Sequence, residues 1–260
     1  MRRVLGVMLA GAAVLVVGCS PDDAAPETPL QSPLSTPSSK SPAPRTTSPP
    51  EAERPSPIPQ RKEVRVRHLG IDASHHQGAI DWPAVAEDGI SFAYLKATEG
   101  TTYTDPTFAG HRAEAQAVGI RVGGYHYFQL CSPGVDQARH FNSVLGDLDG
   151  DDLPPAVDLE LAGSCPTPPP RAILLAEVRA FLEQVEATTE REPVVYLYPE
   201  FEEEYGVAGA LGEYRQWVRS LDGRPDREWW IWQQTDSGSV DGIAGPVDVN
   251  LIWTRETVAR

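Results

Sequence analysis

Cysteine is scarce in this sequence, with three in 260 residues, and the scarcity excludes several kinds of site. Cys19 lies far from the others near the N-terminus, which leaves Cys131 and Cys165 for the rest of the chain. Two cysteines without a cluster of histidines do not supply the four ligands of a structural zinc site. They form either a disulfide or two free thiols, and the export signal described below favours the disulfide.

Positive charge is also sparse, because 22 Lys and Arg stand against 37 Asp and Glu and the net charge is −15. Residues 1–63 hold 7 basic and 6 acidic residues, so residues 64–260 carry a net charge of −16. A surface this acidic argues against nucleic acid as a partner. The charge also serves solubility, which is the simpler interpretation.

Long apolar runs are absent apart from Val4–Val17, which follows the basic pair Arg2 and Arg3. That run is shorter than the roughly 20 residues of a membrane span and is typical of a signal peptide, which we place at residues 1–18. It ends in Leu-Val-Val-Gly-Cys, which resembles a bacterial lipobox with Cys19 as the lipidated residue. The alternative is an ordinary signal peptide in which Cys19 has no role. A lipid on Cys19 would anchor an exported protein to the outer face of a membrane.

Residues 19–63 are predicted to form a disordered tether after the lipidated cysteine. Twelve of the 25 prolines fall here among Ser, Thr and Ala, so the segment lacks the apolar surface needed to fold. Residues 64–260 are long enough for one well-buried domain.

Apolar strand patterns alternate with helical ones along this domain, which indicates a mostly parallel sheet. Strands are expected at 66–72, 91–96, 121–128, 156–161, 193–198, 229–233 and 247–252, and helices at 82–87, 105–117, 135–145 and 171–188. The predicted fold is an irregular (β/α) TIM-like barrel that lacks some outer helices, since few helical patterns follow residue 200. A doubly wound open sheet is the alternative, but no glycine-rich phosphate loop follows the first strand.

Two carboxylates stand two residues apart on the strand expected at 156–161. Asp158 and Glu160 share one face of the strand, while Val157 and Leu159 take the other. Acidic groups resist burial unless they are paired or used, and glycosidic cleavage uses two carboxyl groups a few Å apart. Other polar residues also fall at the carboxyl ends of expected strands, where a β/α barrel builds its active site: Asp72, Lys96, Glu99, His126, Tyr196, Tyr198, Trp232, Gln233, Asp248 and Asn250.

Six motifs in order make residues 66–254 resemble the family 25 glycoside hydrolases, the Chalaropsis-type lysozymes. They are Gly70-Ile-Asp-Ala-Ser-His-His-Gln-Gly78 with Ile80-Asp-Trp82, Phe92-Ala-Tyr-Leu-Lys-Ala-Thr-Glu-Gly100, Gly124-Tyr-His-Tyr-Phe128, Val157-Asp-Leu-Glu160, Trp230-Ile-Trp-Gln233 and Val247-Asp-Val-Asn250. The segment Tyr198-Pro-Glu-Phe201 departs from the small polar residues common there in the family.

The resemblance implies hydrolysis of the β-1,4 bond between N-acetylmuramic acid and N-acetylglucosamine in peptidoglycan, with Glu160 as general acid. Asp158 and Asp72 would be ionised partners, and Asp248 is the fourth acid of the family. Three roles stay open for the partner: stabilising the developing positive charge, acting as nucleophile, or orienting the substrate N-acetyl group. Each acid could instead be a salt-bridged or capping carboxylate.

Aromatic and polar residues of these motifs are expected to bind the sugar, because a flat ring with polar edges suits a pyranose. The predicted substrate-binding residues are Lys96, Tyr125, His126, Tyr127, Tyr196, Trp232 and Gln233. Successive residues on a strand alternate in direction, so about half of the aromatics should be structural, and His126 is as readily a core histidine. Lys96 is expected to pair with an acid of the cluster.

Two other classes of function stay open. One is a wall-binding module that keeps the cleft with little activity, although all four acids are present. The other is a zinc amidase, which the spacing of His75, His76 and His126 disfavours. We therefore expect no metal or cofactor, and a monomer outside the cytoplasm that acts on peptidoglycan strands.

Overall fold

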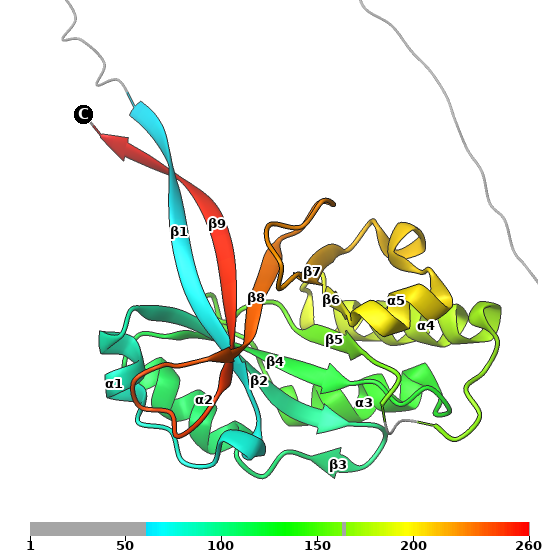
Figure 1. Ribbon diagram of the computed structural model, residues 1–260. Coiled ribbons are helices and arrows are strands. Elements are labelled where there is room, and N and C mark those ends of the chain that lie inside the picture. The colour runs from blue at the N-terminus through cyan, green and yellow to red at the C-terminus, as the bar shows by residue number, and fades with distance from the viewer. Residues whose placement is uncertain (1–60, 163–164, 260) are drawn as a thin grey trace, which may run out of the picture. The chain divides into compact units, whose positions relative to one another are not determined.

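The computed structural model describes residues 61–162 and 165–259, in which nine strands form one sheet (Figure 1). The predicted signal peptide, Cys19 and most of the predicted tether lie outside the described residues. The strands are β1 (Arg61–Ala73), β2 (Ile90–Glu99), β3 (Tyr103–Thr104), β4 (Arg121–Tyr127), β5 (Ala156–Leu159), β6 (Val194–Leu197), β7 (Arg215–Arg219), β8 (Ile231–Gly238) and β9 (Val247–Ala259).

Eight of these strands close into a barrel, as predicted. The order β1-β9-β8-β7-β6-β5-β4-β2 is closed by a parallel pairing of β1 with β2, and β3 forms a short antiparallel pair with β2. Strand β9 runs antiparallel to both β8 and β1, while the remaining pairings around the barrel are parallel. The carboxyl ends of seven strands therefore meet at one end of the barrel.

The outer layer of helices is incomplete, also as predicted. The helices are α1 (Trp82–Glu87), α2 (Phe108–Ala117), α3 (Gly134–Leu145), α4 (Arg171–Thr189) and α5 (Pro199–Tyr205), with 3₁₀ turns at His75–Gln77 and Ala208–Leu211. Within the described residues no helix follows Leu211, so loops alone connect the last three strands. None of the described helices is both long and apolar enough to cross a membrane.

The sequence analysis missed the two-residue strand β3, the strand β7 and the helix α5, and two strands are longer than expected. Strand β7 was not predicted because it is short and has an arginine at each end, and helix α5 because it is only 7 residues long and largely acidic. Strands β1 and β9 continue past the barrel, because Arg61–Leu69 pairs antiparallel with Leu251–Ala259. Figure 1 shows this extension as a twisted two-stranded ribbon that projects from the barrel.

The strands bury a different set of side chains on each face. On β2, Ala93 and Leu95 pack outward against the helices, while Phe92 and Tyr94 fill the barrel interior. A glycine on the neighbouring strand makes room for each ring, since a Cβ at Gly70 would lie 2.4 Å from Phe92 and one at Gly123 would lie 2.5 Å from Tyr94. This aromatic interior closes the barrel below the site and leaves the carboxyl end as the open one.

Candidate active site

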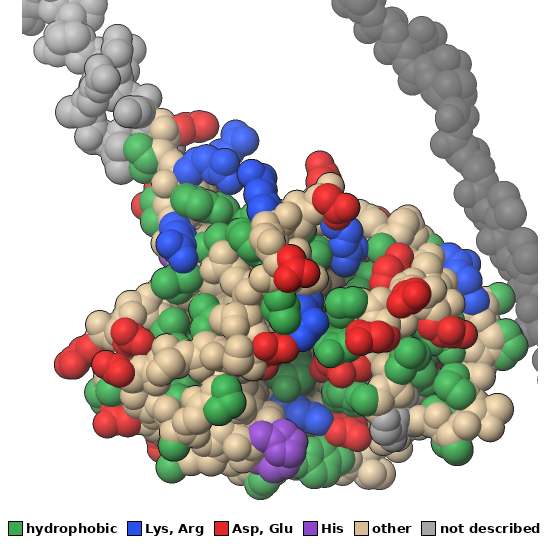
Figure 2. All heavy atoms as spheres, in the orientation of Figure 1, with side chains coloured by type: hydrophobic (Ala, Val, Ile, Leu, Met, Phe, Trp, Pro, Cys, Tyr) green, Lys and Arg blue, Asp and Glu red, His purple; other side chains and the backbone are tan. Residues whose placement is uncertain are grey.

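A cavity of about 340 Å³ lies at the carboxyl end of the barrel, and all four predicted acids line it. Asp72 comes from β1, Asp158 and Glu160 from the end of β5, and Asp248 from β9. Figure 2 shows acidic and basic side chains close together in the hollow below the projecting ribbon. We call this cavity the acid pit.

Asp158 and Glu160 form the centre of the pit. The alternation of β5 turns Val157 and Leu159 into the helix-facing core and both carboxyl groups into the cavity. Burial raises the pKa of Asp158 well above its ordinary value, and repulsion from Glu160 and Asp72 adds to this rise. Burial likewise raises the pKa of Glu160 to about 6, against a hydrogen bond with Asp158 that lowers it. The two carboxyl groups therefore titrate as a pair that retains a proton near neutral pH.

Asp158 is the more enclosed of the pair, with 9% of its surface exposed. Its Oδ1 atom is buried and has no hydrogen-bond partner among the described residues. A buried carboxylate oxygen without a donor is costly, so this atom is prepared to accept a hydrogen bond from a group that enters the cavity.

Asp72 is held by two amide side chains, one from β8 and one from β9. Gln233 and Asn250 donate hydrogen bonds to its Oδ2 atom at 3.1 and 2.8 Å. The Trp217 indole donates to Asn250 Oδ1 at 2.8 Å, and the Tyr196 hydroxyl donates to Gln233 Oε1 at 3.1 Å, so both amides are fixed in turn. Burial raises the pKa of Asp72 to about 6 in spite of these donors.

Asp248 lies directly across from Asp72, because the antiparallel register of β1 and β9 pairs the two residues. Burial raises the pKa of Asp248 to about 8, and the charge on Asp72 adds to the rise. This second pair is non-local in the sequence, because its members are separated by 176 positions, and only the closure of the barrel brings it to the pit.

Two cations face the acids. Lys96 forms an ion pair with Glu99 at 2.7 Å, and its ammonium lies 4.6 Å from the centre of the Tyr127 ring. Lys96 was expected to pair with an acid of the cluster. The acid that it pairs with is Glu99, which lies on the same strand, and not one of the four acids of the pit. Arg219 forms an ion pair with Asp236 at 2.5 Å and lies over the Tyr198 ring.

Five of the seven predicted substrate-binding residues line the pit: Lys96, Tyr125, Tyr127, Tyr196 and Gln233. Together with Tyr198 and Trp217 they place aromatic rings beside the carboxyl groups.

His126 is not brought to the pit. It is fully buried on the outer face of β4, where its ring lies 4.9 Å from Phe181 and its nitrogens bond Thr98 at 2.7 Å and Gln137 at 3.1 Å. Burial lowers its pKa to about 3, so it is a neutral core residue. The prediction failed because Tyr125 and Tyr127 face inward, which turns the residue between them outward.

Trp232 faces away from the pit for the same reason. Its neighbours Ile231 and Gln233 point into the barrel, and its own indole donates to the Ser220 carbonyl at 2.8 Å. The prediction that it binds substrate in the pit is therefore wrong.

The sequence analysis missed Trp217 and Arg219, which line the pit from β7. Their spacing of two is the signal of a strand face, but the segment was not recognised as a strand. Ser74, His76 and Gln77 also line the mouth, in a turn closed by reciprocal bonds between Ser74 and Gln77.

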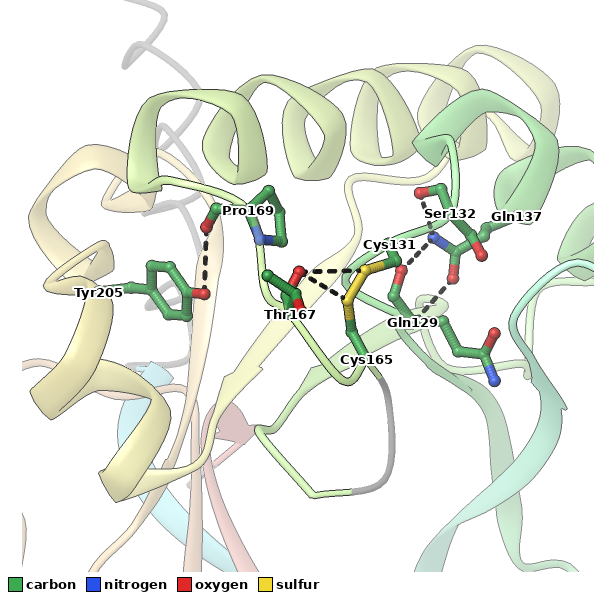
Figure 3. Close-up of a disulfide and its surroundings, with 8 residues drawn as sticks. All are labelled: Gln129, Cys131, Ser132, Gln137, Cys165, Thr167, Pro169 and Tyr205. Atoms are coloured by element: carbon green, nitrogen blue, oxygen red, sulfur yellow. Dashed lines mark hydrogen bonds between the residues drawn. A yellow bond between two sulfur atoms is a disulfide. The ribbon is translucent and has the colours of Figure 1, made fainter.

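A disulfide joins the loops that follow β4 and β5 (Figure 3). The Cα atoms of Cys131 and Cys165 are 5.6 Å apart, so the structure pairs the two cysteines left open by the sequence. The Gln137 side chain braces the first loop by donating to the Gln129 and Ser132 carbonyls, both at 3.0 Å. The bridge thus fixes the loop that leaves Glu160.

Replacing both cysteines with serine is expected to lower the free energy of unfolding by about 3–4 kcal/mol, the chain-entropy value for a loop of this length. The loop spans 34 residues, and its release frees the chain on one side of the pit. Urea unfolding of the two proteins under non-reducing conditions measures the difference. Reduction of the parent protein should reproduce the effect and leave the double variant unchanged.

The comparisons with known proteins agree on one family. Residues 71–243 match the family model for glycosyl hydrolases family 25. The uncharacterized protein YegX of Escherichia coli strain K12 is 37% identical over 191 residues, which cover 70% of this chain and 68% of YegX. Lysozyme M1 of Streptomyces globisporus is 33% identical over 196 residues, covering 70% of this chain and 66% of that protein.

The fold is shared with a solved structure. A family 25 glycosyl hydrolase from Bacillus anthracis superposes with a TM-score of 0.66 at 28% identity, covering 71% of this chain and 88% of that one.

Proposed function

Since the chain belongs to glycosyl hydrolase family 25, we propose that it hydrolyses the β-1,4 bond between N-acetylmuramic acid and N-acetylglucosamine in peptidoglycan. The observation that carries this proposal is the acid pit, where buried carboxyl groups retain protons near neutral pH at the open end of the barrel. Glycosidic cleavage needs such a protonated acid beside an ionised partner.

Glu160 is assigned as the general acid. It follows the last residue of β5 and is less enclosed than Asp158, so its carboxyl group is the member of the pair that a glycosidic oxygen can reach. Its pKa of about 6 keeps a large fraction of the carboxyl group protonated in mildly acidic conditions. Proton transfer to the leaving oxygen then leaves Glu160 ionised and able to activate the water that completes hydrolysis.

Asp158 is assigned to the substrate N-acetyl group. Its unpartnered Oδ1 atom supports a hydrogen bond from the acetamide N–H, which would turn the acetamide oxygen toward the anomeric carbon. That oxygen attacks as the glycosidic bond breaks, and water later opens the ring so formed. Asp72 holds negative charge near the developing positive charge, while Asp248, whose pKa is raised to about 8, stays protonated and shares its proton with Asp72.

The sugar is proposed to lie on the aromatic wall of the pit. Tyr125, Tyr127 and Tyr196 offer flat faces there, and Tyr198 stands where the family usually has small polar residues. The bulk of Tyr198 narrows that side of the pit, so this chain is proposed to differ from its relatives in substrate contacts on that side.

Mass analysis of the muropeptides released from purified peptidoglycan tests the proposal. A muramidase leaves N-acetylmuramic acid at the reducing end, a glucosaminidase leaves N-acetylglucosamine, and an amidase frees the stem peptide. A wall-binding module would adhere to the material and release nothing, which would contradict the enzymatic assignment.

The pH dependence of kcat/KM is expected to be bell-shaped with a maximum near pH 6, the value to which burial raises the pKa of both Glu160 and Asp72. Above pH 6 Glu160 loses the proton that it must donate, and below pH 6 Asp72 becomes protonated and loses the negative charge that faces the developing positive charge. Initial rates on soluble muropeptides between pH 4 and 9 measure the profile, with melting temperatures to verify folding. Full activity at pH 9 would show that Glu160 does not act as the proton donor.

The protein is further proposed to be an exported lipoprotein that works as a monomer on the wall side of the membrane. A Cys19→Ala variant is expected to move from the membrane fraction to the soluble fraction, because it loses the acyl chains that anchor the protein. Fractionation followed by immunoblotting measures the distribution, with a Cys131→Ser/Cys165→Ser variant as the control. A Cys19→Ala protein that stays in the membrane fraction would rule out the lipobox interpretation.

A further inference from the structure

A second and larger cavity, of about 1000 Å³, lies at the end of the barrel opposite the acid pit. Arg215 is the first residue of β7, and Trp230 immediately precedes β8. The projecting ribbon of β1 and β9 forms the other wall, with Arg65 and Trp253. We call this cavity the rear groove. The sugar chemistry of the pit does not use it.

The rear groove concentrates positive charge on a chain whose net charge is −15. Five arginines line it, against two acids, Asp226 and Glu228; they are Arg65, Arg215, Arg224, Arg227 and Arg255. Figure 2 shows basic side chains gathered along the ribbon, whereas acidic ones spread over the rest of the visible face. Like charges repel, so such a gathering on an acidic domain indicates an anionic ligand.

Three of these guanidinium groups lie over tryptophan rings. Arg65 is 5.0 Å from the Trp253 ring centre and Arg215 is 5.0 Å from that of Trp230. A third pair, with 6.0 Å between them, consists of Arg224 and Trp229. Trp253 keeps 38% of its surface exposed, which is high for the largest apolar side chain. The groove therefore offers flat aromatic faces next to fixed cations.

Most of the arginines in the rear groove are not held in close ion pairs by acids of the protein itself. Arg65 and Arg224 make no ion pair with any described residue, and Arg215 and Arg255 have only long ones, at 3.6 Å to Glu192 and 3.9 Å to Glu63. A planar guanidinium with free N–H groups binds a carboxylate in a bidentate manner.

We propose that the rear groove binds a second peptidoglycan strand, with sugar rings on its tryptophan faces and stem-peptide carboxylates on its arginines. This inference rests on the proposed function, because it takes the wall as the medium in which the enzyme works. A strand held at the rear keeps the enzyme on the wall while the pit cleaves another strand.

The shape of the groove favours a strand over a membrane surface. The cationic side chains line a concavity, and the domain around them is strongly acidic, with a charge of −16 on residues 64–260. A flat anionic bilayer would meet those acids together with the arginines, whereas a single strand enters the groove alone.

Co-sedimentation with insoluble peptidoglycan, stripped of phosphodiester-linked polymers by hydrofluoric acid, tests the proposal. Full-length Glu160→Gln protein serves as the parent so that the material is not digested. Adding Arg65→Ser and Arg224→Ser is expected to weaken binding at least fivefold, and the loss should shrink as salt rises, because the salt already screens the removed charges. A matched control carries Arg139→Ser and Arg191→Ser, which remove the same charge outside both cavities.

Activity provides a second readout in the enzyme with Glu160 intact. The Arg65→Ser/Arg224→Ser variant should turn over soluble tetrasaccharide muropeptides at the parent rate, since these fill the pit alone. Its KM on intact peptidoglycan should rise several-fold while kcat is kept.

Unchanged binding in the Arg65/Arg224 variant, or an equal loss in the control, would overturn the proposal. So would unchanged peptidoglycan binding together with lost binding to phosphatidylglycerol vesicles, which would make the groove a membrane surface. The proposed function fails separately. A protein with Glu160 intact that binds through the rear groove but releases no muropeptides would support the groove proposal and contradict the proposed hydrolysis.

Discussion

Replacing Glu160 with glutamine is expected to lower kcat on peptidoglycan by about 10²–10⁴-fold, the range that general acid catalysis contributes. The amide keeps the size and the hydrogen-bonding shape of the side chain but has no proton to give to the leaving oxygen. The release of reducing ends from purified peptidoglycan measures the rate.

The control for this variant is Glu114→Gln on α2, where the carboxyl group is 65% exposed and away from the pit. Both proteins should melt at similar temperatures and bind peptidoglycan alike. A Glu160→Gln protein that kept the parent rate would move the general acid elsewhere in the pit and would contradict the central assignment.

Replacing Asp158 with asparagine is expected to lower kcat by about 10²–10³-fold, through loss of the carboxyl group that accepts the hydrogen bond of the substrate acetamide. The same substitution should make the folded protein more stable, although it lowers activity. Burial raises the pKa of native Asp158 well above the value in the unfolded chain. Its favourable contribution to folding is then complete at low pH and is lost as the pH rises toward the native pKa.

The asparagine variant removes that pH-dependent loss. Its free energy of unfolding should therefore exceed that of the parent above neutral pH by on the order of 1–3 kcal/mol, the size of ordinary single-site effects. The two proteins should converge near pH 4. Urea unfolding at pH 4 and pH 8 measures both, with Asp136→Asn, a half-exposed carboxylate on α3, as the control. A variant that is both inactive and less stable at pH 8 would assign Asp158 a structural role.

The opposite effects follow from the way the pit is built. Four carboxyl groups share a cavity of about 340 Å³, and each of the four has a raised pKa because the barrel removes it from water. A protein that needed only to fold would avoid this arrangement, since the cost of burying charge increases with each neighbour of like charge. The free-energy cost of burying these carboxyl groups is consistent with a site selected for proton transfer, because burial is what raises their pKa values.

Local patterns in the sequence were enough to predict much of this arrangement. The alternation along β5 already placed Asp158 and Glu160 on one face, because the direction of a strand side chain depends only on its position. The same rule, applied to the motifs rather than to each residue, would have turned His126 and Trp232 away from the pit. These two errors came from treating a motif as a set of neighbours that all face the substrate.

Other features depend on contacts between distant segments. Asp72 meets Asp248 only because β9 runs antiparallel beside β1, and Asn250 and Gln233 reach Asp72 only through that same closure. Strand β7 contributes Trp217 and Arg219, although its sequence has no strong strand pattern. Its neighbours β6 and β8 supply the hydrogen bonds that make it a strand.

The sequence by itself therefore determined the family, the barrel class and the identity of the four acids, since these depend on short motifs and on the two-residue period of strands. The tertiary structure decided which aromatic residues face the pit, how Asp72 is held, that Cys131 pairs with Cys165, and that five arginines gather at the far end of the barrel. These features depend on the register between strands that are far apart in the chain, and a register is fixed by packing across the whole barrel rather than by any one segment.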